Sequence, residues 1–485
     1  MTARHALTPG RNCWRIETAD AASVIVDAEG YFRIARQAML TAKHQILLIG
    51  WDFDARIKLV HHPDDGAPAE VGAFIDWLVA RTPGLQVHIL RWDMGALKTL
   101  FRGRTLLTVI RWMFKRRIHL KLDSVHPHGA SHHQKIVVID DCLAFCGGID
   151  MTDDRWDTRA HRDNEPERLN AGGKRYKPWH DATTALSGAV ARALGELGRE
   201  RWARAGGHPI APPPPVAACW PEDLPADFTG IAVAISRTRP EMPDITPVHE
   251  IEALYLDLIA RAERWIYAES QYFASRRVAE AIARRLEEPD GPEIVLLNPQ
   301  TSQGWLEPLA MDTARARLIE AIRPHDRHGR FRVYHPFTAG GAAVYVHAKV
   351  TVIDGVVLRV GSSNFNNRSM RLDTECDVTI DSTLPGNEAA ADRIATTAHE
   401  LIAEHLGVEP QTVARRMAET GSLIATIEAL RGPGRSLRPY QTPELDGLQE
   451  WLADNEILDP EGPEEMFAPL AKRDLLKRLR RRWKG

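Results

Sequence analysis

The stretches His133-Gln-Lys-Ile-Val-Val-Ile-Asp140 and His347-Ala-Lys-Val-Thr-Val-Ile-Asp354 share one pattern of histidine, lysine, apolar residues and aspartate. They are 214 residues apart (347 − 133 = 214), and the same offset relates Gly147 to Gly361 without a gap. Self-similarity over this length indicates two copies of one domain rather than a short repeat. We therefore expect the chain of 485 residues to be a covalent pseudo-dimer.

Both copies alternate short apolar segments with longer helical patterns, which predicts strands and helices around a largely buried sheet. The predicted strands of the first copy cover residues 45–49, 86–92, 135–139 and 143–145. In the second copy we expect strands over 265–268, 293–297, 332–334, 345–353 and 356–360, and helices over 276–287 and 312–322. The predicted fold is α/β, with two tandem, pseudo-twofold-related domains, each a mixed sheet flanked by helices, and a C-terminal helical appendage.

Two breaks in the pattern suggest the domain boundaries. A run of proline at 212–215, followed by Pro221 and Pro225, can only be extended and stiff. A second break lies at Gly432-Pro-Gly434, after which the chain becomes charged and helical. We expect an N-terminal half (1–210), a Pro-rich linker (211–242), a C-terminal half (243–410) and a helical appendage with a basic end (411–485).

The composition predicts an ordinary globular protein, with 62 Lys+Arg against 65 Asp+Glu, a net charge of −3 and 44% hydrophobic residues. This balance disfavours a general nucleic-acid binder. The five cysteines are scattered and form no CxxC pair, so we expect neither a disulfide framework nor a zinc site, and a reducing compartment. The sequence shows no signal peptide and no apolar run long enough for a membrane span. We expect a cytoplasmic protein, peripheral at the membrane, with no metal ion and no cofactor.

The two motifs place an imidazole beside an ammonium. Side chains two residues apart in a strand point the same way, so His133 and Lys135 share one face, as do His347 and Lys349. Substitution at a phosphodiester needs a nucleophile, a proton donor for the leaving oxygen and cations for the equatorial oxygens. Histidine can fill the first two roles near neutral pH, and the lysines supply charge without a divalent cation. One copy alone would be incidental, but two buried lysines in register favour catalysis.

The strand ends add further candidates. Asp140 and Asp354 close the two motifs, and we group them with the catalytic residues; Asp354-Gly355 is also a strong hairpin-turn signal. The return strands then deliver Gly147-Gly-Ile-Asp150 and Gly361-Ser-Ser-Asn364 beside the histidines and lysines. Small residues there let a ligand approach the backbone closely.

These motifs resemble the phospholipase D superfamily, which is named for its His-Lys-Asp signature. The similarity covers roughly residues 10 to 405 and is greatest to the eukaryotic-type catalytic core. The segments that carry it, besides the two motifs, are Ala144-Phe-Cys-Gly-Gly-Ile-Asp150, Arg155-Trp-Asp157, Pro178-Trp-His-Asp181, Glu269-Ser-Gln-Tyr-Phe273 and Asn364-Phe-Asn-Asn-Arg-Ser369.

The resemblance implies a ping-pong mechanism through a phosphohistidine, at the seam between two similar domains. His133 would be the nucleophile and His347 the general acid, although the pseudo-symmetry leaves the opposite assignment open. Lys135, Lys349 and Asn364 would bind the phosphoryl oxygens, with Gly148 and Ser362 in supporting positions.

A nucleophilic imidazole needs an acceptor that fixes its tautomer. The family-matching candidates are Asp181 and Glu375, and Asp373 competes with Glu375. Asp150 stands where the second copy has Asn364, and an ionised, unpaired carboxylate there would repel a phosphodiester. We therefore assign Asp150 a supporting role, paired with Arg155, and no contact with phosphate.

The leading hypothesis is a phospholipase D that hydrolyses the distal phosphodiester of glycerophospholipids to phosphatidic acid and the head-group alcohol, and that can pass the phosphatidyl group to an alcohol. The alternatives are a cardiolipin-synthase-like phosphatidyltransferase, a metal-independent nuclease and a catalytically silent lipid-binding member. The expected partners are a phospholipid, an anionic membrane surface and water or an alcohol as acceptor, with no nucleic acid. We expect a monomer, because both motifs lie in one chain.

Two basic amphipathic stretches are candidates for membrane contact. They cover residues 102–117 and 474–485, where Leu, Ile, Trp or Phe alternate with Arg and Lys. Such runs are also common in helices that pack on a core and keep a solvated charged face. Head-group selectivity would depend on the loops 159–177 and 302–309.

Overall fold

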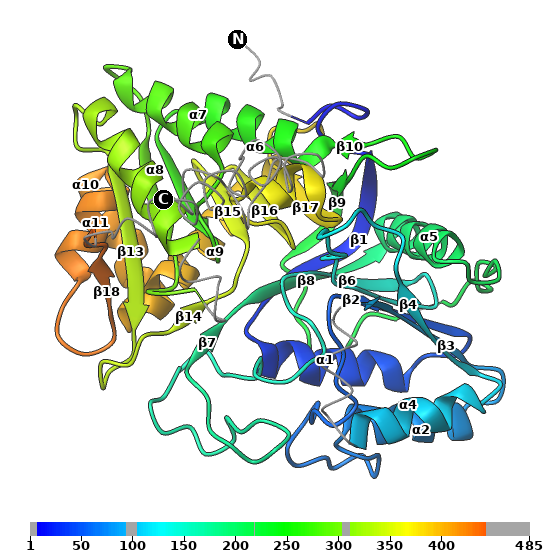
Figure 1. The fold of residues 1–485 in the computed structure, drawn as a ribbon. Coiled ribbons are helices and arrows are strands. Elements are labelled where there is room, and N and C mark those ends of the chain that lie inside the picture. The colour runs from blue at the N-terminus through cyan, green and yellow to red at the C-terminus, as the bar shows by residue number, and fades with distance from the viewer. Residues whose placement is uncertain (1–6, 94–103, 218, 303–310, 443–485) are drawn as a thin grey trace, which may run out of the picture.

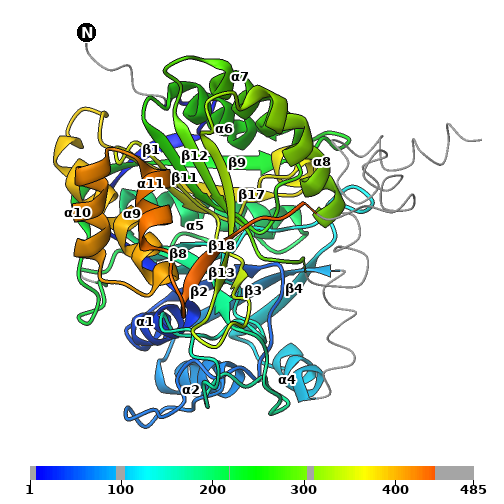
Figure 2. The ribbon, with the colours of Figure 1, turned by 90° about the vertical axis from the view of Figure 1, so that its left-hand side faces the viewer.

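The computed structural model describes residues 7–93, 104–217, 219–302 and 311–442. Within these ranges 16 strands join into one mixed sheet with helices on both faces, and two further strands pair with each other in a separate small sheet (Figures 1 and 2). The predicted α/β class is confirmed.

The first half begins with a long strand and then alternates strands and helices. Its strands are β1 (Arg15–Val26), β2 (Gln45–Gly50), β3 (Gln86–Trp92), β4 (Ile118–Asp123), β5 (Ile136–Ile139), β6 (Leu143–Gly147), β7 (Trp179–His180) and β8 (Ala182–Gly188). Its helices are α1 (Ala28–Leu40), α2 (Val71–Arg81), α4 (Arg104–Met113) and α5 (Ala189–Arg204).

The second half repeats this order from residue 228 onward. Its strands are β9 (Phe228–Arg239), β10 (Val248–His249), β11 (Trp265–Glu269), β12 (Glu293–Leu297), β13 (Phe331–Phe337), β14 (Tyr345–Val346), β15 (Val350–Ile353), β16 (Val357–Gly361), β17 (Glu375–Asp381) and β18 (Ser436–Pro439). Its helices are α6 (Glu250–Arg261), α7 (Arg276–Glu287), α8 (Thr313–Ile322), α9 (Ala391–Leu406), α10 (Pro410–Thr420) and α11 (Leu423–Leu430), with short helices η2 (Arg323–His325), η3 (Arg368–Leu372) and η4 (Glu388–Ala390).

The order of strands in the sheet reflects the internal repeat. From the centre outward, the first half reads β1-β8-β6-β5-β2-β3-β4 and the second reads β9-β17-β16-β15-β11-β12-β13. Each half therefore combines a parallel outer part with an antiparallel inner part. The two halves meet where β1 pairs antiparallel with β9. In Figure 1 the first half, blue to cyan, lies at lower right, and the second half, green to orange, lies at upper left.

The short motif strands β5 and β15 are buried on both faces, as their continuous apolar sequences predict. In β5, Ile136 and Val138 join a core beneath α5 and α9, whereas Val137 and Ile139 join a core beneath α1 and α2. A third core lies beneath α6 and α7 in the second half. The core under α5 and α9 contains residues of both halves, so burial of apolar surface holds the halves together.

The predicted linker is wrong at its C-terminal end. Residues 228–239, which we expected inside the linker 211–242, form strand β9 at the centre of the sheet. The pattern Ile231, Val233, Ile235 alternates with smaller or polar residues, but the preceding prolines led us to extend the linker across it. The stretch 211–227 does lack helix and strand where it is described.

The predicted C-terminal appendage is only partly separate from the second half. Its described part, 411–442, contains most of α10, together with α11 and β18. Strand β18 pairs with the edge strand β13, so this segment extends the sheet rather than standing apart from it. The remainder of the appendage, including the basic stretch 474–485, lies outside the described residues.

The expectation of no disulfide is contradicted. Cys142, in the turn between β5 and β6, is paired with Cys219 in the linker, 77 residues later. Nothing in the spacing indicates this pair, because the fold alone brings the linker back against the first half. Trp220 and Leu224, next to Cys219, pack on the core beneath α1 and α2.

Among the helices of the described residues, none is both long enough and apolar enough to cross a bilayer.

Candidate active site

The two His-x-Lys segments lie at matching ends of the sheet. Each enters a short strand, β5 or β15, that runs antiparallel to its neighbour β2 or β11. His133 and His347 therefore lie at the carboxyl ends of the outer parallel strands, which is where open α/β sheets bind ligands. Each segment is also hydrogen-bonded to the opposite half: the His133 amide donates to the Thr374 carbonyl (2.9 Å) and the His347 amide to the His180 carbonyl (2.7 Å).

Glu375 of the second half orients His133 of the first half. The Nδ1 atom of His133 lies 3.0 Å from both carboxylate oxygens of Glu375. The hydroxyl groups of Ser362 and Ser369 donate to the same carboxylate, at 2.5 and 2.7 Å. Glu375 was one of our candidates, and its competitor Asp373 instead accepts from the Ser131 amide and from Arg368.

Asp181 of the first half orients His347 of the second half. Its Oδ2 atom lies 2.6 Å from Nδ1 of His347, and both side chains are buried. The length is that of a charge-assisted hydrogen bond. Each imidazole thus has its Nδ1 atom occupied by a carboxylate from the other half, which leaves Nε2 as the free nitrogen.

The lysines are held close to the histidine that precedes them. The Nζ atom of Lys135 donates to the His133 carbonyl at 2.8 Å and lies 3.1 Å from the Asp150 carboxylate. The ammonium of Lys349 donates to the His347 carbonyl and lies 3.0 Å from Nδ1 of His347. The two copies differ in that Lys135 has an ionic partner of its own, whereas the position equivalent to Asp150 is Asn364 in the second copy.

Before a substrate binds, the electrostatics favour the neutral form of both imidazoles near pH 7. Burial, with the charges of Lys135 and Lys349, lowers the pKa of His133 well below its usual range. Burial and Lys349 lower the pKa of His347 as well, against the opposing effect of Asp181. A neutral imidazole that donates a hydrogen bond from its Nδ1–H to a carboxylate has an unprotonated Nε2, which is the form that a nucleophile requires.

The two carboxylates have opposite pKa shifts. Burial raises the pKa of Glu375 to about 8, against the hydrogen bonds from Ser362 and Ser369. Burial opposes ionisation of Asp181 too, but the charge and hydrogen bond of His347, with the charge of Lys349, lower its pKa to about 2. Pairs of groups whose environments separate their pKa values are typical of acid and base roles.

Lys349 links the two copies electrostatically. Burial lowers its pKa to about 7, Asp181 acts against this, and the charge of Lys135 lowers it further. Because Lys349 also lowers the pKa of both histidines, its charge is felt on both sides of the pseudo-twofold. The arrangement concentrates positive charge at one place, as a site for a phosphoryl group requires.

The glycine segments make room for the carboxylates. A Cβ atom at Gly148 would lie 2.2 Å from Oδ1 of Asp181, so a side chain there would displace the partner of His347. Ser362, at the equivalent place in the second copy, instead donates to Glu375. The backbone amide of Asn364 donates a hydrogen bond to Oγ of Ser369 at 3.0 Å. The side-chain oxygen of Asn364 is buried without a hydrogen-bond partner among the described residues.

Asp140 and Asp354 do not lie at the site, and our grouping of them with the catalytic residues is corrected. Asp354 accepts three backbone hydrogen bonds, from the amides of residues 263, 264 and 265, at 2.7, 2.8 and 2.7 Å. Asp140 makes the same bonds to residues 43, 44 and 45. Both stand seven residues beyond the histidines, roughly 20 Å away along a strand. They anchor the starts of β11 and β2.

The predicted pairing of Asp150 with Arg155 is also corrected. Asp150 pairs with Lys135 and accepts from the Trp51 amide at 3.0 Å. The guanidinium of Arg155 instead stacks over the Trp179 ring, with 4.4 Å between its central carbon and the ring centroid. The supporting role of Asp150 stays a prediction.

Sequence reasoning missed the aromatic wall beside His347. The Trp179 ring stacks on Tyr345 (centroids 4.6 Å apart) and contacts the His347 ring (5.1 Å). Trp179 belongs to the segment Pro178-Trp-His-Asp181, and Tyr345 begins the strand predicted over 345–353, but only the fold shows that β7 and β14 pair in parallel at this place. Their packing fixes the ring plane of His347.

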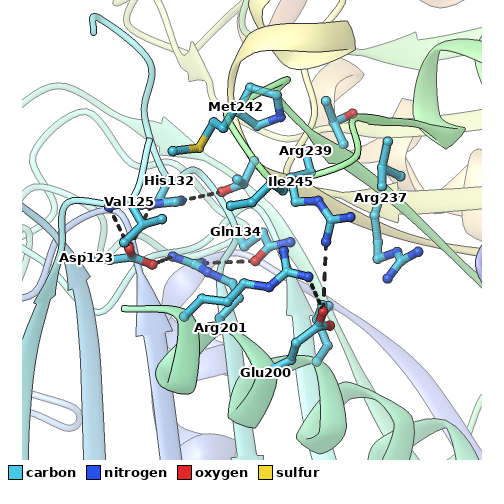
Figure 3. A pocket seen from close by; sticks show the side chains of 16 residues that line it. Asp123, Val125, His132, Gln134, Glu200, Arg201, Arg237, Arg239, Met242 and Ile245 are labelled. Atoms are coloured by element: carbon cyan, nitrogen blue, oxygen red, sulfur yellow. Dashed lines mark hydrogen bonds and ion pairs between the residues drawn. The ribbon is translucent and has the colours of Figure 1, made fainter. Parts of the chain in front are cut away.

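A small pocket of about 50 Å³ lies behind the His133 segment and contains neither His133 nor His347 (Figure 3). His132 and Gln134 face it, because they alternate with His133 and Lys135 along the chain. Arg201 donates to Gln134 (2.9 Å) and to Asp123 (2.7 Å), and Asp123 also lies 3.0 Å from the His132 ring. This buried network supports the catalytic segment from its other face.

Comparisons with known proteins agree with this geometry. A model described as "Phospholipase D" matches residues 38–213, and one described as "Cardiolipin synthase, PLD-like domain" matches residues 255–401, so each motif falls within its own match. The chain is 23% identical to phospholipase D alpha 1 of Carica papaya over 77% of its own length and 63% of that protein. It is 22% identical to phospholipase D A of Dictyostelium discoideum, over 80% of its length and 35% of that protein.

The chain thus spans less than two thirds of the length of these relatives. Among solved structures, the phosphatidylserine synthase of Haemophilus influenzae superimposes with a TM-score of 0.51 at 12% identity, over 85% of this chain and 96% of that one. This likeness concerns the fold. The two matched models and the phospholipase D relatives show that the chain belongs to the phospholipase D superfamily.

Proposed function

We propose that the protein is a phospholipase D that cleaves the distal phosphodiester of a glycerophospholipid. One observation carries the proposal: each motif histidine is held at Nδ1 by a buried carboxylate of the opposite half, His133 by Glu375 and His347 by Asp181. Two imidazoles prepared in this reciprocal way suit a two-step displacement at one phosphorus atom.

In the first step, Nε2 of His133 forms a bond to phosphorus and the bond from phosphorus to the head-group oxygen breaks. His347 takes up a proton at Nε2 when the anionic phosphodiester binds, and it gives this proton to the leaving oxygen. In the second step, His347 takes a proton from water, the water oxygen bonds to phosphorus, and the bond to His133 breaks. Lys135 and Lys349 stabilise the charge on the equatorial oxygens throughout.

The pKa shifts favour this assignment over its reverse. Asp181 stays ionised, because His347 and Lys349 lower its pKa to about 2, and it makes a short bond to His347. An ionised partner stabilises the imidazolium that a general acid must form. Burial raises the pKa of Glu375 to about 8, so at neutral pH this partner stabilises a charged His133 less than Asp181 stabilises a charged His347. Once ionised, Glu375 accepts the Nδ1 proton of a neutral His133 and leaves Nε2 free for attack.

A second candidate is transfer to an alcohol rather than to water. The match of the second half to a cardiolipin synthase model favours it. The chemistry is the same up to the phosphohistidine, after which His347 deprotonates an alcohol instead of water. Hydrolysis and transfer therefore differ in which acceptor reaches the site, and not in the residues that act.

The test uses substrates from three classes. We would compare head-group release from phosphatidylcholine, phosphatidyl transfer to ethanol and nicking of plasmid DNA, in buffer without added divalent cations. Head-group release with the transfer product in the presence of ethanol supports the proposal. Nicking alone would replace it with a nuclease, and vesicle binding without turnover would replace it with a silent lipid-binding protein.

Contact with the membrane is a separate proposal. The exposed apolar side chains Ile110, Met113 and Phe114 lie at or just beyond the C-terminal end of α4. That end leads into the start of β4, so it lies opposite the carboxyl ends of the strands and faces away from the histidines. We therefore favour the basic stretch 474–485 as the membrane contact, paired with anionic lipid.

Deletion of 474–485 tests this proposal. Binding to anionic vesicles should weaken, whereas turnover of a soluble short-chain phospholipid should not change, because the deletion leaves the motif residues intact. Equal vesicle binding by the full chain and the shortened chain would remove the idea.

The compartment and the oligomeric state also remain proposals. A disulfide such as Cys142–Cys219 is typical of oxidising compartments and favours one over the cytoplasm that we expected. We propose a monomer, because one chain supplies both motifs and both orienting carboxylates.

A further inference from the structure

A second buried cluster of titratable side chains lies beside the active site and takes no part in the proposed chemistry. Asp27 stands between β1 and α1, His161 lies in the segment between β6 and β7, His180 belongs to β7, and Glu404 belongs to α9. Their side chains are 1%, 0%, 0% and 3% exposed. The first three belong to the first half of the chain and Glu404 to the second.

The four side chains surround one point. Nε2 of His161 lies 3.1 Å from Oε1 of Glu404 and 3.5 Å from Oδ2 of Asp27. Nδ1 of His180 lies 3.0 Å from the same Glu404 oxygen and 3.3 Å from Oδ1 of Asp27. Ligands at about 2.0–2.1 Å from a tetrahedral zinc ion lie about 3.3 Å from one another, so these separations match a tetrahedral cage.

Two polar atoms that point into the cage lack hydrogen-bond partners among the described residues. They are Oδ2 of Asp27 and Nδ1 of His180, both fully buried. Nδ1 of His180 lies within 3.3 Å of two carboxylates and yet has the wrong direction for a hydrogen bond to either. A cation between these atoms would satisfy both.

The outer nitrogen of each imidazole already has a carboxylate partner. Nδ1 of His161 lies 3.1 Å from Asp157, and Nε2 of His180 lies 2.9 Å from Glu269. A histidine that binds a metal ion through one nitrogen almost always donates from the other to such a group, which fixes its orientation. Here the same arrangement occurs twice.

The charged neighbours leave the cage open. Arg159 donates to Oε2 of Glu404 at 2.6 Å, and Arg168 donates to Asp157 at 3.1 Å. Neither takes the inward atoms, Oε1 of Glu404 and Oδ2 of Asp27, and a third guanidinium, that of Arg435, lies 3.8 Å from Oε1 of Glu404, beyond hydrogen-bond distance. The donor set is therefore two imidazole nitrogens and two carboxylate oxygens, which suits Zn²⁺ and not the all-oxygen shells of Ca²⁺ or Mg²⁺.

We propose that Asp27, His161, His180 and Glu404 bind one structural Zn²⁺ ion that joins the two halves of the chain. Four protein ligands leave no open position for water or substrate, so the ion is structural and not catalytic. It would fix β7, whose His180 carbonyl accepts from the amides of His347 and Ala348 and whose next residue, Asp181, orients His347. The ion would therefore stabilise the seam on which the site is built.

Metal analysis of the full chain tests the proposal directly. Protein produced in zinc-containing medium and passed over a desalting column should carry about one zinc per chain. Asp27→Asn and His161→Gln should lose most of it. His325→Gln should keep it, because that imidazole is exposed and pairs only with Glu287 in the described structure. Asp157→Asn should weaken zinc affinity by about 10- to 100-fold without removing a ligand.

A second measurement on the wild type avoids the risk that a variant fails to fold. Removal of the ion with dipicolinate should lower the melting temperature, and one equivalent of Zn²⁺ should restore it. X-ray absorption at the zinc edge should show two nitrogen and two oxygen ligands. Another transition metal at one equivalent, lost in the same variants, would support the site. The proposal would be overturned if the wild type contained no metal and its melting temperature changed with neither dipicolinate nor Zn²⁺. The cluster would then be a network of protonated histidines. Equal loss of zinc in His325→Gln would also overturn the proposal.

Discussion

Replacement of Glu375 by glutamine tests how the opposite half prepares the nucleophile. Glu375 is buried, lies 3.0 Å from Nδ1 of His133 and accepts from Ser362 and Ser369. Glutamine has the same shape but no charge. It can also present its NH₂ group to Nδ1, which moves the imidazole proton to Nε2 and blocks attack.

The size of the effect follows from the bond that is lost. A hydrogen bond to a charged group contributes about 1.5–3 kcal/mol net. At 1.36 kcal/mol for each factor of ten, kcat/KM should fall by about 10- to 150-fold. A change in the tautomer of His133 would lower kcat/KM further, so the loss of about 10- to 150-fold is a minimum.

Two substrates separate this role from that of the general acid. A short-chain phosphatidylcholine needs a proton on its leaving alcohol, whereas a p-nitrophenyl phosphodiester does not. Because His133 attacks in both cases, Glu375→Gln should slow both substrates by a similar factor. Asp181→Asn, the matched control, should lower kcat/KM for phosphatidylcholine far more than kcat/KM for the nitrophenyl ester. Asp181 acts through His347, and kcat/KM reports the first step, in which the nitrophenyl ester needs no general acid.

The reasoning would be refuted if Glu375→Gln, with an unchanged melting temperature, turned over the nitrophenyl ester at the wild-type rate. A loss confined to phosphatidylcholine would instead exchange the roles of the two histidines.

Three further predictions follow from the same contacts. Attack by His133 requires an ionised Glu375, and burial raises the pKa of Glu375 to about 8, so kcat/KM should rise from pH 6 to about pH 8. A wild-type profile that is flat over this range would contradict this prediction, as would an unchanged rise in Glu375→Gln. Asp354→Ala removes the acceptor of three backbone hydrogen bonds and should lower the free energy of unfolding by roughly 3–5 kcal/mol, with turnover per folded molecule unchanged. If the variant lost turnover but kept its stability in urea unfolding, Asp354 would be a catalytic residue. The Cys142–Cys219 disulfide closes a loop of 77 residues, so Cys142→Ser should lower the free energy of unfolding by about 4 kcal/mol. Alkylation of the unfolded wild type should label three thiols before reduction and five after it. Five labelled thiols without reductant would show that the disulfide is not formed.

The sequence predicted the catalytic pairs because their chemistry is local. His133 and Lys135 lie two residues apart in one strand, and repetition of the pattern made an incidental origin improbable. Glu375 and Asp181 could be proposed from motif segments, but their exchange between halves could not. That exchange depends on the sheet order, in which β6 and β8 face β16 and β17 across the central pair of strands.

The central strands themselves escaped prediction. β1 and β9 are each twelve residues long and pair along the contact between the halves, but alanine, threonine and charged residues interrupt their apolar pattern. Asp140 and Asp354 were misassigned for the opposite reason. They recur with the catalytic residues in sequence, although a strand separates them from the site in space.

The disulfide and the buried histidine cluster depend on segments that the sequence cannot bring together. Cys142 and Cys219 are 77 residues apart, and Asp27 is far from Glu404 along the chain. Contacts of this kind are properties of the tertiary fold, and neither spacing nor periodicity reveals them.

The most direct test of the account is a burst experiment with the p-nitrophenyl phosphodiester and His347→Asn. This substrate needs no general acid for its first step, but hydrolysis of the phosphohistidine still needs His347. The account predicts about one equivalent of rapid nitrophenolate release, followed by a stall, with an acid-labile, base-stable phosphoryl group mapped to His133. No burst, or a phosphoryl group on a residue outside the two motifs, would contradict a site in which one half supplies the nucleophile and the other completes the reaction.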